Sequence, residues 1–158
     1  MNFSDLFRRR DAALHWLNAT QFLGGLNDSL FRMSVLIFLL GLNPASTDLM
    51  LSATTSIFAL PFLLVAPFAG FLADRYSKSR LATLLKDAEL VIMLLALPAL
   101  AFRSAWLLYV FLLLMALQSA LFQPVKEAMV PELVKDESLG SANGKIIFYF
   151  TLSGLFGI

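Results

Sequence analysis

Long apolar runs separated by short polar turns form the pattern of this chain. A helix that crosses a bilayer core of about 30 Å needs around 20 residues, and five runs are close to or above that length. They are residues 16–42, 49–73, 81–102, 105–123 and 139–158. Backbone groups in hydrocarbon must be hydrogen-bonded within their own segment, so these runs predict transmembrane helices. The expected fold class is an all-α membrane protein, in which Pro124 closes the fourth helix.

Basic residues gather at the N-terminus and at the second and fourth turns. Nine of the 12 lysines and arginines lie there: Arg8, Arg9, Arg10, Arg75, Lys78, Arg80, Lys126, Lys135 and Lys145. Loops on the cytoplasmic side are rich in lysine and arginine, so the N-terminus is expected in the cytoplasm. The last apolar run is still continuing at Ile158, so we expect a truncated fragment; a small five-helix protein is the alternative.

The first apolar run carries two charges near its middle, Asp28 and Arg32. Each costs about 2.5–3.5 kcal/mol at bilayer depth on insertion scales. Their i, i+4 spacing allows the two side chains to meet, and they share one helix stripe with Gln21, Gly24 and Gly25. We expect this stripe to face a water-filled cavity. The alternative is an ion pair that only fixes helix packing.

The third run carries Lys86, Asp87 and Glu89 about two turns from its start. Lys86 and Glu89 are three residues apart, so they can pair on one helix face. A structural ion pair is expected here, with coupling of transport to an ion as the other interpretation.

Composition limits the possible functions. The chain has 158 residues, 59% of them hydrophobic and 15% charged, with a net charge of +1, which suggests no nucleic-acid partner. It contains no cysteine and one histidine, His15, so metal sites and thiol chemistry are not expected. No glycine-rich phosphate loop or Ser/His/Asp set is present, so no cofactor or catalytic residue is expected.

The turn between the second and third runs reads GFLADRYSKSR. Gly70 allows close helix approach, and Asp74 lies where the helix reaches the cytoplasmic surface. An acid there can pair with a base or a helix N-terminus in one conformation and release it in another. We therefore expect Gly70, Asp74, Arg75, Lys78 and Arg80 to form a conformational latch. A positive-inside loop that happens to contain Asp-Arg is the alternative.

This turn resembles the signature between helices two and three of the major facilitator superfamily. All five of those residues match, whereas Ser77 stands where the family prefers glycine. The resemblance implies two six-helix halves with the substrate between them, of which this chain holds the first five helices of the N-terminal half. The C-terminal half of the same protein would then be its partner.

Two further segments resemble bacterial lysophospholipid transporters, especially the transporter domain fused to a phospholipid acyltransferase and an acyl-carrier-protein ligase. Residues 26–32 read LNDSLFR where that family reads like Phe-Asn-Asp-Asn-Leu-Phe-Arg/Lys. The family's Pro-Val-Lys after its fourth helix is matched at residues 124–126, with a later match at Pro131. The chain departs from the family at Gln123, Glu127 and Ile147.

The resemblance implies movement of lysophosphatidylethanolamine-like lipid across the bacterial inner membrane by alternating access, for re-acylation by a fused or separate acyltransferase. The implied substrate-binding residues are Asp28, Arg32, Lys126, Asn27 and Gln123. The alternatives are a drug or metabolite exporter of the same superfamily, the membrane part of a bifunctional transporter–acyltransferase, and a non-transporting anchor. The acyltransferase His-x4-Asp box is missing here, because Thr20 stands five residues after His15.

Overall fold

The computed structural model describes residues 3–42, 47–133 and 139–157. Within these ranges the side chains of residues 3–11, 66–67, 69, 72–74 and 139 are outside the description. All described elements are helices: α1 (Phe3–Leu42), α2 (Thr47–Arg75), α3 (Lys78–Ala101), α4 (Ala105–Leu133) and α5 (Leu139–Phe156). The predicted all-α fold class is therefore confirmed.

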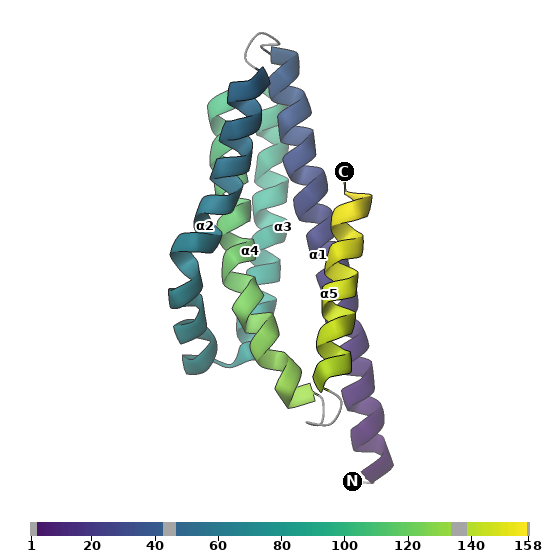
Figure 1. Cartoon of the computed structure of the whole chain (residues 1–158). Helices are drawn as coiled ribbons and strands as arrows, with labels where there is room; N and C mark the ends of the chain where they lie inside the picture. The colour runs from purple at the N-terminus through teal and green to yellow at the C-terminus, as the bar shows by residue number, and fades with distance from the viewer. Residues whose placement is uncertain (1–2, 43–46, 134–138, 158) are drawn as a thin grey trace.

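The five helices run alongside one another, and α4 occupies the centre (Figure 1). It contacts α1, α2, α3 and α5, whereas α5 packs mainly along α1. Figure 1 shows α5 beside the middle of α1, while the N-terminal part of α2 lies near the C-terminal end of α1. The α4 helix therefore has neighbours from every other helix.

The main apolar core lies between α1, α3 and α4. Val35 and Leu39 of α1 pack with Ala96 of α3 and with Leu108 and Leu112 of α4, all at most 1% exposed. Many large apolar side chains instead point outward, among them Trp16, Leu63, Phe102, Trp106 and Leu155. An outward apolar surface of this kind suits contact with lipid.

Three described helices are long and apolar enough to cross a membrane by length and composition. They are Ala12–Leu42, Thr47–Val65 and Ala105–Leu133. The first half of α3 contains five charged residues, Lys78, Arg80, Lys86, Asp87 and Glu89, and α5 contains Asn143 and Lys145. Crossing by α3 and α5 stays a prediction from the sequence.

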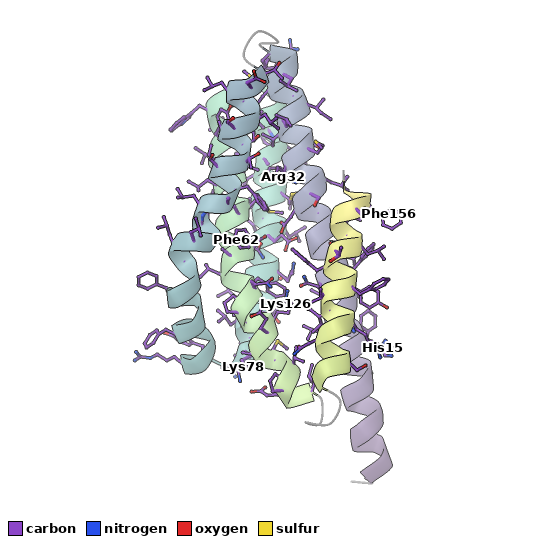
Figure 2. The ribbon with its side chains drawn as sticks, in the orientation of Figure 1. His15, Arg32, Phe62, Lys78, Lys126 and Phe156 are labelled. Carbon is purple, nitrogen blue, oxygen red and sulfur yellow. The ribbon has the colours of Figure 1, made fainter. Side chains whose placement is uncertain are left out.

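The prediction that Pro124 closes the fourth helix is wrong, because α4 continues through Pro124 and Pro131 to Leu133. A proline removes one backbone hydrogen bond, and packing against neighbouring helices can hold the helix together around it. The residues that follow Pro124 are buried: Val125 is 0% and Lys126 1% exposed. Likewise α1 begins at Phe3, well before the apolar run, and α2 bends near its middle, close to Phe62 (Figures 1 and 2).

Small residues bring α1 and α5 into close contact. A Cβ atom on Gly25 would lie 3.2 Å from Cβ of Ser153 and closer still to its Oγ, and Gly157 lies directly against Ser29. Gly25 and Ser29 are four positions apart on α1, and Ser153 and Gly157 are four positions apart at the end of α5, which is the spacing that lets membrane helices approach closely. By contrast, no described atom lies within 4 Å of the Cβ position of Gly70, so the close approach expected there is not found.

This contact predicts that Gly25→Val destabilises the protein. The added side chain overlaps Ser153, and overpacking of this kind costs typically 1–3 kcal/mol. We expect a lower midpoint of thermal unfolding in detergent, followed by size-exclusion chromatography. Gly144→Ala is the control, because no described atom lies within 4 Å of its Cβ position. Equal midpoints for the two variants would contradict the close packing of α1 and α5.

Candidate functional site

Asp28 lies where α1 faces α4. Its Oδ2 accepts a hydrogen bond from Ser119 Oγ at 2.7 Å. Its other oxygen, Oδ1, is buried and has no hydrogen-bond partner among the described residues. A buried carboxylate oxygen without a donor is costly, so this atom has an unused capacity to bind one.

The Asp28–Arg32 ion pair, the alternative to a cavity-facing stripe, is absent from the part of the chain that the structure describes. The two side chains have different neighbours: Ser119 of α4 reaches the carboxylate, and Phe58 of α2 reaches the guanidinium. The Arg32 Cζ lies 5.5 Å from the Phe58 ring centroid, a cation–π distance. The i, i+4 spacing allowed the pair, but tertiary contacts separate the two charges.

A small cavity of about 30 Å³ adjoins Asp28, with room for ordered water. All five helices contribute to its wall. The lining residues are Thr20, Gln21, Gly24, Gly25, Asp28, Phe62, Lys86, Ser119, Phe122, Gln123 and Phe150. Polar groups from α1, α3 and α4 thus converge on one water-sized space beside the carboxylate.

A larger cavity of about 410 Å³ also borders Asp28 and lies between α1, α2 and α5. Asp28 and Arg32 provide its two charges, and Phe58, Phe62 and Phe150 provide aromatic walls. Figure 2 labels Arg32 and Phe62 in this part of the bundle. The predicted polar stripe therefore does border internal space, which combines opposite charges with apolar surface.

A second carboxylate, Glu89 of α3, is only 8% exposed and has three donors. Asn27 Nδ2 donates to Oε1 at 2.8 Å, and Lys86 Nζ lies 2.5 Å from Oε2. Gln118 Nε2 donates to Oε2 at 3.2 Å. The predicted Lys86–Glu89 pair is therefore confirmed, whereas Asn27 contacts Glu89 across the helix interface.

Gln118 and Ser119 join the two carboxylates. Ser119 Oγ lies 3.1 Å from Gln118 Oε1, and Gln118 Nε2 also donates to the Leu85 carbonyl at 3.0 Å. Sequence reasoning missed Ser119, because a serine within an apolar run carries no signal of its own. Its position one residue after Gln118 was the available hint, since both lie on the polar side of α4.

Lys126 is buried beneath Gln123. It is 1% exposed, its Nζ donates to Gln123 Oε1 at 2.7 Å, and the nitrogen lies 5.7 Å from the Phe150 ring centroid. Gln123 in turn donates to Glu127 Oε1 at 2.7 Å. Gln123 lines the small cavity, but Lys126 lines neither of the cavities that Asp28 borders.

The five predicted site residues therefore do not all line the same cavity. Asp28 and Arg32 share the larger cavity, and Asp28 and Gln123 share the smaller one. Asn27 lines a groove of about 420 Å³ together with Lys86 and Glu89. Lys126 is covered by Gln123 in this conformation.

The turn that carries the predicted latch is short, since α2 ends at Arg75 and α3 begins at Lys78. Ser77 has φ −58° and ψ 113°, a conformation open to any residue, so glycine is not needed there. The Arg75 Cζ lies 5.8 Å from the Phe71 ring centroid, and Arg80 is exposed. The side chain of Asp74 is outside the described residues.

Lys78 forms an ion pair with Glu132 near the C-terminal end of α4. Figure 2 shows Lys78 at this end of the bundle. The pair joins α3 to α4 at the end of the bundle where the predicted latch lies. The sequence did not predict this pair, because Glu132 lies beyond the expected end of the fourth helix. Its existence follows from the continuation of α4 through Pro131.

The Lys78–Glu132 pair predicts a double-mutant result. Lys78→Glu and Glu132→Lys should each lower stability, and the exchange Lys78→Glu/Glu132→Lys should restore it. The Lys78 side chain is partly exposed and the Glu132 side chain is exposed, so the coupling energy should be about 0.2–1 kcal/mol. Thermal unfolding at low and high salt measures it. Additive losses in the double variant would show that the pair contributes nothing.

Comparison with known proteins identifies the family. Residues 17–158 match the family model described as Major Facilitator Superfamily. The chain is 29% identical over 137 residues to YfiS of Bacillus subtilis (strain 168), described as an uncharacterized MFS-type transporter. That match covers 85% of this chain and 31% of the relative, so the chain spans about a third of the relative's length. No solved structure matches the chain. The family match over most of the sequence, on an all-helical chain with membrane-length apolar helices, shows that this multi-pass membrane protein belongs to the Major Facilitator Superfamily.

Proposed function

We propose that the protein is a transporter that moves a lysophospholipid of the lysophosphatidylethanolamine type across the bacterial inner membrane by alternating access. Family membership supports transport in general, and the site supports this substrate class. The observation that carries the proposal is the Asp28 carboxylate, whose Oδ1 lacks a donor while the residue lines a cavity with charged and aromatic walls.

A zwitterionic single-chain lipid matches the chemistry of this cavity. Its ammonium supplies the donor that Asp28 Oδ1 lacks, as a charge-assisted hydrogen bond. Its phosphate needs a base, and the planar guanidinium of Arg32 suits phosphate geometry. Its acyl chain finds apolar surface on Phe58, Phe62 and Phe150. The ammonium, the phosphate and the acyl chain of such a lipid therefore each have a binding partner in the larger cavity.

Alternating access requires contacts that hold one state and break in another. The Lys78–Glu132 pair holds the adjacent ends of α3 and α4 together in this conformation. We assign it, with the turn at residues 70–80, to the latch of this state. The basic residues of this turn support a cytoplasmic location, with the N-terminus on the same side.

The second candidate is an exporter of amphipathic cations from the same superfamily. It is favoured by the engagement of Arg32 with Phe58, which leaves Asp28 as the charge with an open hydrogen-bonding position. Such a substrate needs no phosphate partner. Competition between lysophosphatidylethanolamine and a cationic amphiphile for the purified full-length protein separates the two candidates.

The lysophospholipid proposal also assigns a partner. Lipid that reaches the cytoplasmic leaflet would be re-acylated by an acyltransferase, either separate or fused to the same protein. In this proposal the described residues bind and translocate the lipid, and the acyltransferase carries out the re-acylation.

The proposal predicts that Asp28→Asn impairs transport. The variant keeps the size of the side chain but removes the charge that pairs with the ammonium, a contact worth about 1.5–3 kcal/mol or roughly 10- to 100-fold. Uptake of labelled lysophosphatidylethanolamine by proteoliposomes containing the full-length protein should fall by that factor.

Asp48→Asn is the matched control, because it removes the same charge from an exposed position in the first turn of α2. It should transport at the wild-type rate. Normal transport by Asp28→Asn, or wild-type protein that moves a cationic amphiphile but no lysolipid, would overturn the lysophospholipid proposal.

A further inference from the structure

Lys86 of α3 is a basic residue beside the Asp28 site, for which the sequence favoured a structural ion pair, with coupling of transport to an ion as the alternative. It lines the small cavity that contains Asp28 and also the groove that contains Asn27 and Glu89. Its side chain is 27% exposed, and its Nζ lies 4.5 Å from the Phe122 ring centroid. Among the described residues that line the small cavity, it provides the positive charge.

Gly24 makes room for this ammonium group. A Cβ atom on Gly24 would lie 2.7 Å from Lys86 Nζ. The lysine nitrogen therefore rests against the bare backbone of α1, at the boundary between the small cavity and the groove. Gly24 lines both spaces with Lys86, so the ammonium can reach either one.

Glu89 can release Lys86 without becoming an unsatisfied buried carboxylate. After departure of the ammonium, Asn27 still donates to Oε1 and Gln118 still donates to Oε2. Removing one partner of a buried pair is normally costly because the other is left without donors. Here two amide donors remain, which lowers that cost and makes the lysine available to a ligand.

The helical positions place one base on each side of Asp28. The Lys86 ammonium lies at the level of Gly24 on α1. Gly24 and Arg32 each lie four residues from Asp28, which is about 6 Å along the helix in opposite directions. While the ammonium of a zwitterionic headgroup stays on Asp28, the phosphate of the same headgroup can therefore meet a base toward either membrane surface. Alternating access needs such an exchange of partners as the substrate changes sides.

We infer that Lys86 is a substrate-binding residue that takes the anionic group of the transported amphiphile on the cytoplasmic side of Asp28, leaving Glu89 to Asn27 and Gln118. Arg32 holds the same group on the opposite side. This inference rests on the proposed function for its substrate class. It differs from an assignment to Lys126, which is covered by Gln123.

Binding of two probes to the full-length protein in detergent tests the inference. Lysophosphatidylethanolamine carries the phosphate, and a monoacylglycerol with the same acyl chain does not. Lys86→Gln should weaken binding of the first probe about tenfold or more, the value of one charge-assisted contact, and change binding of the second by less than about twofold. Arg103→Gln, an exposed site between α3 and α4, removes an equal charge and should change neither.

Equal losses for both probes would show that Lys86 only maintains the fold, and no loss would show that it does not contact the substrate. Wild-type protein that fails to bind lysophosphatidylethanolamine would also overturn the inference. If binding depends on Lys86 but no lipid is moved in proteoliposomes, only the transport proposal fails. If lipid is moved and Lys86→Gln behaves like wild type, only this inference fails.

Gly24→Ala provides a second variant that leaves Lys86 in place. The added methyl meets the flexible end of the lysine, so the ammonium should shift while the helices keep their positions. Phosphate-probe binding should fall with little change in thermal midpoint. Gly25→Ala, whose methyl meets Ser153, should instead lower the midpoint. Wild-type probe binding by Gly24→Ala would contradict the placement of Lys86.

Discussion

A carboxylate halfway along a membrane helix must find hydrogen-bond donors, and in this protein the donor for Asp28 comes from α4. The Ser119–Asp28 hydrogen bond links the two helices that organise the bundle, because α4 contacts every other helix and α1 carries the polar stripe. Among the described residues this donor serves Oδ2 only, so the bond holds α1 and α4 together while leaving Asp28 Oδ1 unsatisfied. The proposed substrate class and the proposed exchange of partners both depend on that remaining acceptor.

The contrast with Glu89 shows why one acid is assigned to binding and the other to structure. Glu89 receives donors from α1, α3 and α4, which satisfies both oxygens and ties the three helices together. Asp28 receives one donor from the residues that the structure describes, and it opens onto internal space. Intramembrane acids are expensive, and they are retained either where donors surround them or where a ligand supplies the missing contact. The two carboxylates of this bundle represent these two cases, joined by Gln118 and Ser119.

Much of the fold could be predicted from the sequence, because apolar run length is a strong signal in membrane proteins. The all-α class, the helix order and the Lys86–Glu89 pair followed from periodicity and spacing. The end of α4 did not, because Pro124 and Pro131 are helix breakers in water but are held here by packing around Val125 and Lys126. That single error hid Glu132 and its pair with Lys78.

The site was less predictable, for reasons that are also physical. The i, i+4 spacing of Asp28 and Arg32 allowed an ion pair, but Phe58 and Ser119 attract the two side chains to other helices. Sequence spacing reports contacts within one helix, whereas the role of a buried polar group is set by neighbours from others. Ser119 and Gly24 illustrate this, because their importance arises only from the side chains of Asp28 and Lys86 opposite them.

Reaction of introduced cysteines with a membrane-impermeant thiol reagent tests most directly whether water reaches the Asp28 site. This chain has no cysteine, so a single thiol at position 119 can be introduced with Ser119→Cys in a cysteine-free full-length background. Ile37→Cys, on the exposed apolar face of α1, is the control. We expect the thiol at position 119 to react and to be protected by lysophosphatidylethanolamine, while the thiol at position 37 stays unreactive in lipid. A thiol at position 119 as unreactive as the lipid-facing control would contradict a hydrated cavity beside Asp28.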